Sequence, residues 1–110
     1  MKEYKLFING QWREAVNKNT KEVLSPSTGE CIAIVQDGDA HDAEVVLEAA
    51  QSSFKHWAKT PARKRAECLR EFVACIREDK DRLAELLVQE QGKLLKVAKM
   101  EVGVTCSFIE

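Results

Sequence analysis

Short runs in which apolar and polar residues alternate fill the first third of the chain. Residues 5–8 and 11–13 have the two-residue period of strands. Asn9-Gly10 lies between them, and this pair is a strong hairpin signal because both central residues of a type I′ turn need positive φ. Residues 22–24 and 31–35 predict two more strands around a turn at 25–30. We therefore expect residues 1–36 to be strands and turns.

Apolar residues recur every three or four positions over residues 39–110, which predicts three to four amphipathic helices. Asp39 is the expected N-cap of the first helix, with Asp42 as an acidic residue in its first turn. Thr60-Pro61 should end that helix and begin the next, with proline at the first helical position. The first helix carries an apolar stripe that is expected to be buried against a partner: Ala43, Val46, Leu47, Ala50, Phe54 and Trp57.

Charged residues at 78–82 interrupt the next helical pattern, which predicts two helices or one helix with a polar joint. Gly92 stands where a left-handed C-terminal cap is expected. The last segment keeps helical spacing from Leu95 to Ile109 with no stop signal. We therefore expect the chain to end within a helix and to be incomplete at its C-terminus.

Composition and charge exclude several classes of partner. Hydrophobic residues make up 45% of the 110 residues, enough for the core of one ordinary domain. Lys and Arg number 17 against 18 Asp and Glu, so no net positive field favours nucleic acid or an anionic membrane. The charged N-terminus leads into only three consecutive apolar residues, which predicts neither a signal peptide nor a membrane span. A cytoplasmic location is the expectation.

The cysteines, histidines and glycines form no familiar reactive motif. Cysteine spacing lacks the C-x2-C pattern of zinc sites, and only His41 and His56 could join such a site. No glycine pattern matches a dinucleotide fingerprint or a P-loop. We predict no catalytic and no cofactor-binding residue in the chain. The cysteines are expected to be reduced thiols packed as small hydrophobes, with Cys106 in the core: Cys31, Cys68, Cys75 and Cys106.

A set of short motifs in a fixed order resembles the N-terminus of the NAD(P)-dependent aldehyde dehydrogenases. This resemblance implies an α/β protein in which residues 1–110 are the N-terminal part, and outer layer, of a Rossmann-like nucleotide-binding domain. Ser25, where asparagine is common, and Leu94, where proline is common, leave the subfamily open. The matching residues are Phe7-Ile8-Asn9-Gly10 with Trp12, Ser25-Pro26 to Gly29-Glu30, Ala49-Ala50 to Phe54 and Trp57, Arg65 with Leu69, Gly92-Lys93, and Glu101-Val102.

By this resemblance, a full-length parent would oxidise a small aldehyde to a carboxylic acid with NAD or NADP. The family's catalytic cysteine, its general-base glutamate, its oxyanion-hole asparagine and its nucleotide contacts all lie beyond Glu110. The resemblance also implies a homo-oligomer, with the rest of the parent chain as a partner of this segment. The isolated chain is expected to be inactive. The alternative is an independent small helical module whose exposed apolar face binds another protein.

Glu90-Gln91-Gly92-Lys93 is a helix end with a glycine cap and a cation suited to the negative end of the helix dipole. It also resembles the acid-x-Gly-Lys element of the same family. In some members this acid helps to hold a structural monovalent cation together with backbone oxygens. The resemblance places those oxygens at Val23 and Leu24, with Glu90 as the acid. Oxygen ligands suit such a hard cation, and the remaining ligands would come from further chain or from water.

Overall fold

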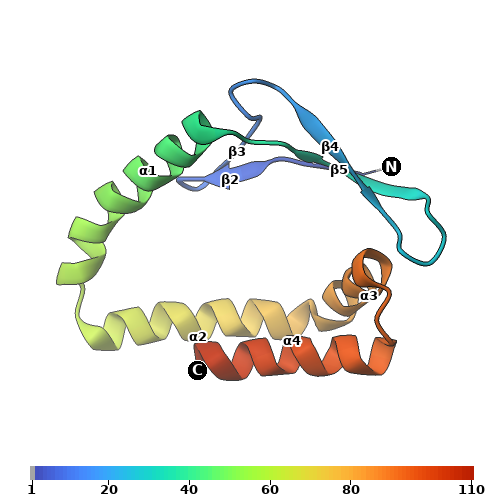
Figure 1. Cartoon of the computed structure of the whole chain (residues 1–110). Helices are drawn as coiled ribbons and strands as arrows, with labels where there is room; N and C mark the ends of the chain where they lie inside the picture. Colours follow the sequence, from blue (N-terminus) through green and yellow to red (C-terminus); the bar gives the residue numbers. More distant parts are fainter. Residues whose placement is uncertain (1) are drawn as a thin grey trace. The chain divides into compact units, whose positions relative to one another are not determined.

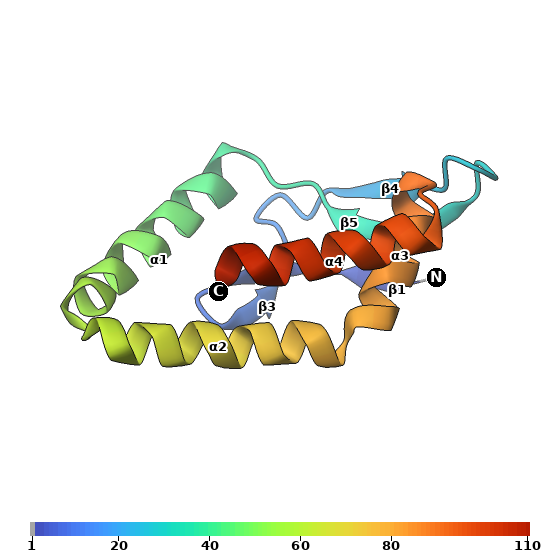
Figure 2. The same cartoon turned by 90° about the horizontal axis from the view of Figure 1, so that it is seen from below.

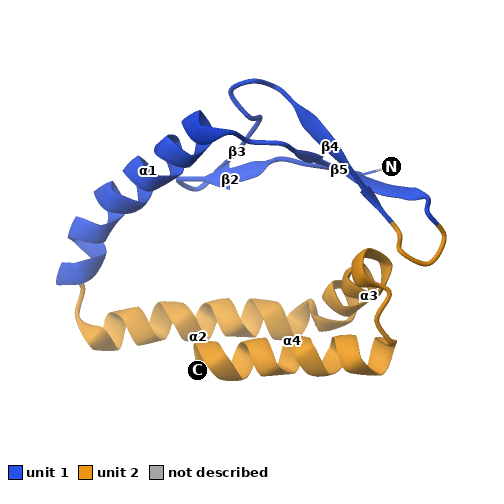
Figure 3. Cartoon of the chain, in the orientation of Figure 1, with its two compact units in different colours: residues 1–24, 29–59 blue, residues 25–28, 60–110 orange. Residues whose placement is uncertain are grey.

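Five strands followed by four helices make up the part of the chain that the structure describes, residues 2–110 of a computed structural model (Figure 1). The chain divides into two compact units (Figure 3). Unit 1 holds all the strands and the first helix, up to Leu24 and again over Gly29–Lys59. Unit 2 holds the short turn Ser25–Thr28 and the remaining helices, Thr60–Glu110. The predicted order of strands and then helices is confirmed.

A three-stranded sheet forms the larger β element of unit 1. Its strands are β1 (Lys2–Tyr4), β4 (Thr20–Leu24) and β5 (Cys31–Gln36), in the order β1-β5-β4. The strands predicted at residues 22–24 and 31–35 are confirmed as β4 and β5, with slightly longer bounds. They pair antiparallel. The sequence did not predict β1, which lies parallel to β5 with Lys2 opposite Ala33. Polar residues of a short edge strand carry no alternation signal, so only its pairing partner reveals it.

The predicted hairpin is present as β2 (Leu6–Ile8) and β3 (Gln11–Arg13), which pair antiparallel. Asn9 and Gly10 have φ of 53° and 76°, the positive values that the tight turn requires. Phe7 lies opposite Trp12, and their rings are 4.8 Å apart at an interplanar angle of 48°. Such a tilted aromatic pair stabilises the register of a hairpin that is otherwise marginal.

Two carboxylates organise the start of helix α1 (Ala40–Lys59). Asp39 caps it as predicted, because its carboxylate accepts the backbone N–H of His41 at 3.0 Å. The Asp42 carboxylate accepts the N–H of Asp39 at 3.0 Å and, across 26 residues, the N–H of Val16 at 3.0 Å. Asp42 is only 5% exposed. These hydrogen bonds, first from Asp39 and then from Val16, hold the pKa of Asp42 below its ordinary value of 3.8.

Replacing Asp42 with asparagine should weaken unit 1 in a pH-dependent way. A depressed carboxyl pKa means that the stabilisation is complete above the unfolded-state pKa and is lost as the pH falls through the lower folded-state value. Asp42→Asn should therefore lower the melting temperature at pH 7, and the difference from wild type should shrink on acidification below about pH 4. Thermal melts from pH 7 to pH 2.5 measure this. A difference that is constant with pH would contradict the role of the charged carboxylate.

The large side chains of the apolar stripe predicted on α1 are exposed in the structure of these 110 residues. Val46, Leu47, Phe54 and Trp57 expose 45%, 67%, 66% and 39% of their surfaces. The helical spacing is thus confirmed, while burial of this stripe against a partner stays a prediction. None of the helices in residues 2–110 combines the length and apolar character that crossing a bilayer requires.

Unit 2 consists of helices α2 (Ala62–Glu78), α3 (Lys80–Gln91) and α4 (Leu95–Ile109) together with the Ser25–Thr28 turn. Of the two alternatives predicted at the polar interruption, two separate helices are observed: α2 ends at Glu78 and α3 begins at Lys80. Asp79 lies between them, and its N–H donates to the Cys75 carbonyl while its own carbonyl accepts the N–H of Leu83. Pro61 was predicted to be the first helical residue of α2. It is instead the N-cap residue, so α2 begins one position later, at Ala62. Figures 1 and 2 show α4 alongside α2. Small residues allow the tight packing of α3 on α4: the core contains Ala84, Ala98 and Val102.

The prediction that all four cysteines pack as small hydrophobes is wrong for two of them. Cys106 is 1% exposed and lies in the core of unit 2 as predicted, and Cys31 is half-buried. Cys68 and Cys75 are exposed. Their seven-residue spacing puts them on one side of α2, about two turns apart, whereas Val73 on the other side is buried. Helical periodicity alone did not identify which side of α2 faces the core.

Truncating Cys106 should destabilise the chain while truncating Cys75 should not. Cys106→Ala removes a fully buried sulfur and should lower the free energy of unfolding by about 1 kcal/mol. Cys75→Ala removes an exposed one and should change it by less than about 0.5 kcal/mol. Urea unfolding of both variants followed by circular dichroism provides the comparison. Equal effects would place Cys106 outside the core.

Candidate functional site

The end of α3 forms a tight turn into α4. Gly92 has φ of 69° and ψ of 21°, and its N–H donates to the Val88 carbonyl at 2.8 Å. The predicted left-handed cap is therefore confirmed. The next residue, Lys93, forms an ion pair with Glu101 in the second turn of α4. This pair ties the turn to the following helix, a use of the lysine charge that the helix-dipole argument did not anticipate.

The Gly92 turn packs against the Ser-Pro turn of the same unit. A Cβ atom added at Gly92 would lie 3.1 Å from Cγ of Pro26, closer than ordinary van der Waals contact. Ser25, immediately before this proline, is 7% exposed, and its hydroxyl lies 3.1 Å from that of Ser27. Glycine at position 92 is thus required both by its positive φ and by the proline beside it. Sequence reasoning singled out both turns but did not predict that they touch.

Val23 and Leu24, the predicted carbonyl ligands, are the last two residues of β4 in unit 1. The register shifts between them: Val23 lies opposite Ala33 and Leu24 opposite Cys31, so Ile32 has no partner across the ladder. A bulge of this kind interrupts the hydrogen-bonded ladder and redirects backbone groups. It lies one residue before the Ser25–Thr28 turn of unit 2.

Glu90, the predicted acid, lies in the last turn of α3 with an exposed side chain. It belongs to unit 2, whereas Val23 and Leu24, the predicted carbonyl ligands, belong to unit 1. Across residues 2–110, no three His, Cys, Asp or Glu side chains gather in a group that could hold a metal ion.

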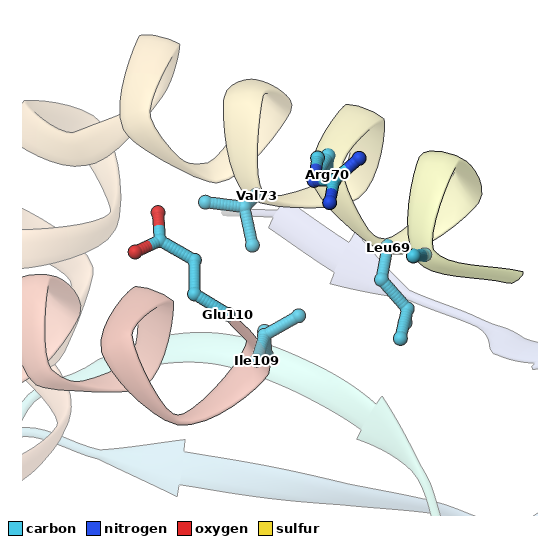
Figure 4. A pocket seen from close by; sticks show the side chains of 6 residues that line it. Leu69, Arg70, Val73, Ile109 and Glu110 are labelled. Atoms are coloured by element: carbon cyan, nitrogen blue, oxygen red, sulfur yellow. The ribbon is translucent and has the colours of Figure 1, made fainter. Parts of the chain in front are cut away.

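Two cavities of unit 2 are lined mostly by apolar residues. Figure 4 shows one of about 120 Å³, where Ile109 and Glu110 at the end of α4 face Leu69, Arg70 and Val73 of α2. Of its two charged residues, Glu110 forms an ion pair with Arg77 of α2. Another cavity, of about 380 Å³, is mostly apolar. Ligand sites combine an apolar lining with a few precisely placed polar groups.

The basic run at the start of α2 makes surface ion pairs. Arg63 and Lys64 lie 3.7 Å and 3.8 Å from the carboxylate of Glu67, which follows them by four and three residues along the helix. These side chains are mostly exposed, so the pairs are weak. His41 and His56 are exposed on α1.

The relatives of the chain are aldehyde dehydrogenases. A 3,6-anhydro-alpha-L-galactose dehydrogenase of Vibrio sp. (strain EJY3) is 51% identical over 110 residues, which is 100% of this chain and 23% of that protein. A solved structure of a 3,6-anhydro-L-galactose dehydrogenase is 53% identical, with a TM-score of 0.93 over 96% of this chain and 22% of the other. An E. coli NADP dependent enzyme is 33% identical, with a TM-score of 0.95 over 98% and 22%.

The chain spans less than a quarter of the length of these relatives. Their matching segments nevertheless adopt the same fold as this chain, as the TM-scores above 0.9 indicate. The model of the family described as "Aldehyde dehydrogenase family" matches residues 12–110, nearly all of the chain. The chain belongs to the aldehyde dehydrogenase family.

Proposed function

We propose that the 110 residues serve as the N-terminal part of the nucleotide-binding domain in an enzyme that oxidises an aldehyde to a carboxylic acid. The family match over residues 12–110 carries this proposal. In such an enzyme a cysteine thiolate adds to the aldehyde carbon, the resulting thiohemiacetal loses a hydride to NAD or NADP, and water hydrolyses the thioester to acid and thiol. By the family resemblance, the nucleophile would be a cysteine in the part of a family-length chain that these 110 residues do not span, and the buried Cys106 would be a packing residue.

The residues of this chain would have a structural role in that reaction. Asp42 fixes the loop at Val16 to the start of α1, and the Gly92 turn fixes the Ser25–Thr28 turn to α3 and α4. Each contact would make its own unit more rigid, and a rigid support helps to hold a binding site in its productive geometry. We further propose a cytoplasmic homo-oligomer, on the basis of the family resemblance.

A chimera tests this function. The corresponding N-terminal segment of the Vibrio relative would be replaced by these 110 residues, and reduced cofactor would be followed by absorbance with 3,6-anhydro-α-L-galactose and NAD or NADP. We expect cofactor reduction by the chimera, and none above a boiled control by the 110-residue chain or by the Vibrio remainder without this segment. A soluble, folded chimera without activity would contradict the proposed function.

A second proposal concerns the structural cation. We propose that the Glu90 carboxylate and the carbonyl oxygens of Val23 and Leu24 contribute to a monovalent cation site. The ladder interruption between Val23 and Leu24 supports this, as does the contact of Pro26, two residues after Leu24, with Gly92, two residues after Glu90. The donor set is one that Na⁺ or K⁺ accepts, with carboxylate and carbonyl oxygens together.

The cation proposal has its own measurement, which does not depend on activity. Melting temperatures of the chimera would be recorded in NaCl, KCl and choline chloride at one ionic strength. We expect a higher melting temperature in Na⁺ or K⁺, loss of that increase in Glu90→Gln, and its retention in the matched control Glu85→Gln, an exposed acid of the same helix. The same cation dependence in both variants would exclude Glu90 as a ligand.

A further inference from the structure

The turn of the β2–β3 hairpin places a nucleophile next to an electrophile. Asn9 and Gly10 are both exposed, and asparagine is among the thermolabile residues of proteins. The backbone nitrogen of the residue after an asparagine can attack the side-chain amide carbon, because the two atoms close a five-membered ring. A side chain on that residue hinders the attack, so glycine is the most reactive neighbour. A Cβ atom added at Gly10 would meet nothing within 4 Å, so this side of the turn is open.

The neighbouring residues distinguish Asn9 from the other asparagines of the chain, Asn17 and Asn19. All three are exposed, so access to water does not separate them. The side-chain oxygen of Asn17 accepts the backbone N–H of Asn19 at 2.9 Å, which holds its amide away from the following nitrogen. Lys18 follows Asn17, and the β-branched Thr20 follows Asn19, so a side chain crowds each attacking nitrogen. Asn9 is the asparagine that precedes a glycine.

We propose that Asn9 is a site of deamidation by water without an enzyme. The Gly10 nitrogen bonds to the side-chain carbon of Asn9, and the amide nitrogen leaves as ammonia with the proton from Gly10. A cyclic imide remains, and water then adds to one of its two carbonyl carbons. Opening on one side leaves aspartate. Opening on the other leaves isoaspartate, in which the main chain runs through the former side chain. Water is the one co-reactant, and nothing is oxidised or reduced.

The hairpin controls how often the reacting atoms meet. Ring closure requires rotation about the Cα–C bond of Asn9, and the pairing of Ile8 with Gln11 restrains this bond while the turn is closed. The adjacent pair, Phe7 and Trp12, stacks at 4.8 Å between ring centroids and helps to keep it closed. Because each strand has three residues, the hairpin is short enough to open readily. Deamidation therefore proceeds from the opened hairpin, and the aromatic pair slows it.

The two products change the hairpin to different extents. Aspartate, like asparagine, tolerates positive φ and supports a type I′ turn before glycine, so this product keeps the turn and adds a negative charge. Isoaspartate lengthens the main chain by a methylene group between Ile8 and Gln11. The two-residue turn then no longer matches the register of the strands. Ile8 is 7% exposed, so the isoaspartate form disturbs a buried residue of unit 1.

Peptide mapping of the 110-residue chain after prolonged incubation at neutral pH tests the proposal. Mass spectrometry detects the exchange of an amide for a carboxyl group, and an isoaspartyl methyltransferase labels the isoaspartate product. A sample digested at time zero corrects for reaction during digestion. We expect conversion of Asn9 at least tenfold faster than that of Asn17 or Asn19 in the same sample. Equal rates at the three asparagines would overturn the proposal. An Asn9 that stays intact while a urea-unfolded sample is converted would overturn it as well.

Two variants separate ring closure from simple exposure of an asparagine. Gly10→Ala has room for its methyl group, but the positive φ at this position weakens the turn. We nevertheless expect at least tenfold slower conversion of Asn9 in this variant, because the methyl group hinders the attacking nitrogen. Faster conversion would overturn the proposed reaction.

Trp12→Ala removes the ring pair and should accelerate conversion of Asn9 at least threefold. Trp57→Ala, the same truncation on α1, is the matched control and should leave the rate unchanged. Equal rates in these two variants would overturn control of the reaction by the hairpin. None of these readouts uses enzyme activity, so they test the site independently of the proposed function.

Discussion

The isolated chain should bind a hydrophobic dye such as ANS and should sediment as assemblies larger than a monomer. Exposed apolar patches larger than a few hundred Å² are rare on monomers and cause association. Both units here expose large apolar side chains in groups. In unit 1 they include Phe7, Trp12, Leu47 and Phe54, and in unit 2 Phe72, Leu94, Met100, Val104 and Phe108.

Analytical ultracentrifugation over a range of concentrations, with dye fluorescence on the same samples, measures this expectation. The matched sample is the family-length chimera, in which the same 110 residues should bind much less dye per molecule because further chain covers them. A monomeric isolated chain with a sharp cooperative melt and no dye binding would contradict the prediction. That result would favour the independent helical module instead.

Replacing Gly92 with alanine should be among the most damaging conservative changes in the chain. A non-glycine residue at φ of 69° costs about 1–2 kcal/mol from backbone strain. The new Cβ would also lie 3.1 Å from Pro26, so the proline ring or the turn must move. We therefore expect a loss of about 2–3 kcal/mol in the free energy of unfolding, at the upper end for a strained backbone position.

Gly29→Ala is the matched control for this change. Gly29 has φ of 75°, close to that of Gly92, but an added Cβ there meets nothing within 4 Å. The control should therefore show the backbone strain alone, about 1–2 kcal/mol. Urea unfolding of the two variants at low protein concentration, followed by circular dichroism, gives the difference. Equal losses would mean that the Pro26 contact contributes nothing to stability.

Local signals explain which parts of the fold could be predicted from the sequence. Asn9-Gly10, Asp39 and Gly92 determine the conformation of their immediate neighbours, and the structure places a hairpin turn, an N-cap and a C-cap at these residues. β1 was missed because its residues are polar and its partner β5 is distant in sequence. The exposed side of α2 was misassigned at Cys68 and Cys75, because the position of a helix relative to its core is decided by packing.

The candidate site likewise has features that could be predicted from the sequence and features that could not. The helix end at Glu90 to Lys93 could be recognised from residue types, since a glycine cap has a local conformational cause. The contact of Pro26 with Gly92 could not, because it joins residues far apart in the sequence. The Asp42 hydrogen bond to Val16 was missed for the same reason. Backbone carbonyl ligands leave no trace in residue identity, so Val23 and Leu24 entered only through the family resemblance.

The parallel pairing of β1 with β5 affects the order in which the chain folds during synthesis. Lys2 leaves the ribosome before its partner Ala33, which follows about thirty residues later, a delay of roughly 2–6 s at cellular rates of translation. Helices α3 and α4, in contrast, are adjacent in the chain and can pack as soon as both have emerged. In the interval, the first strand has no hydrogen-bonding partner in the sheet. Its charged residues Lys2 and Glu3 discourage pairing with strands of neighbouring nascent chains.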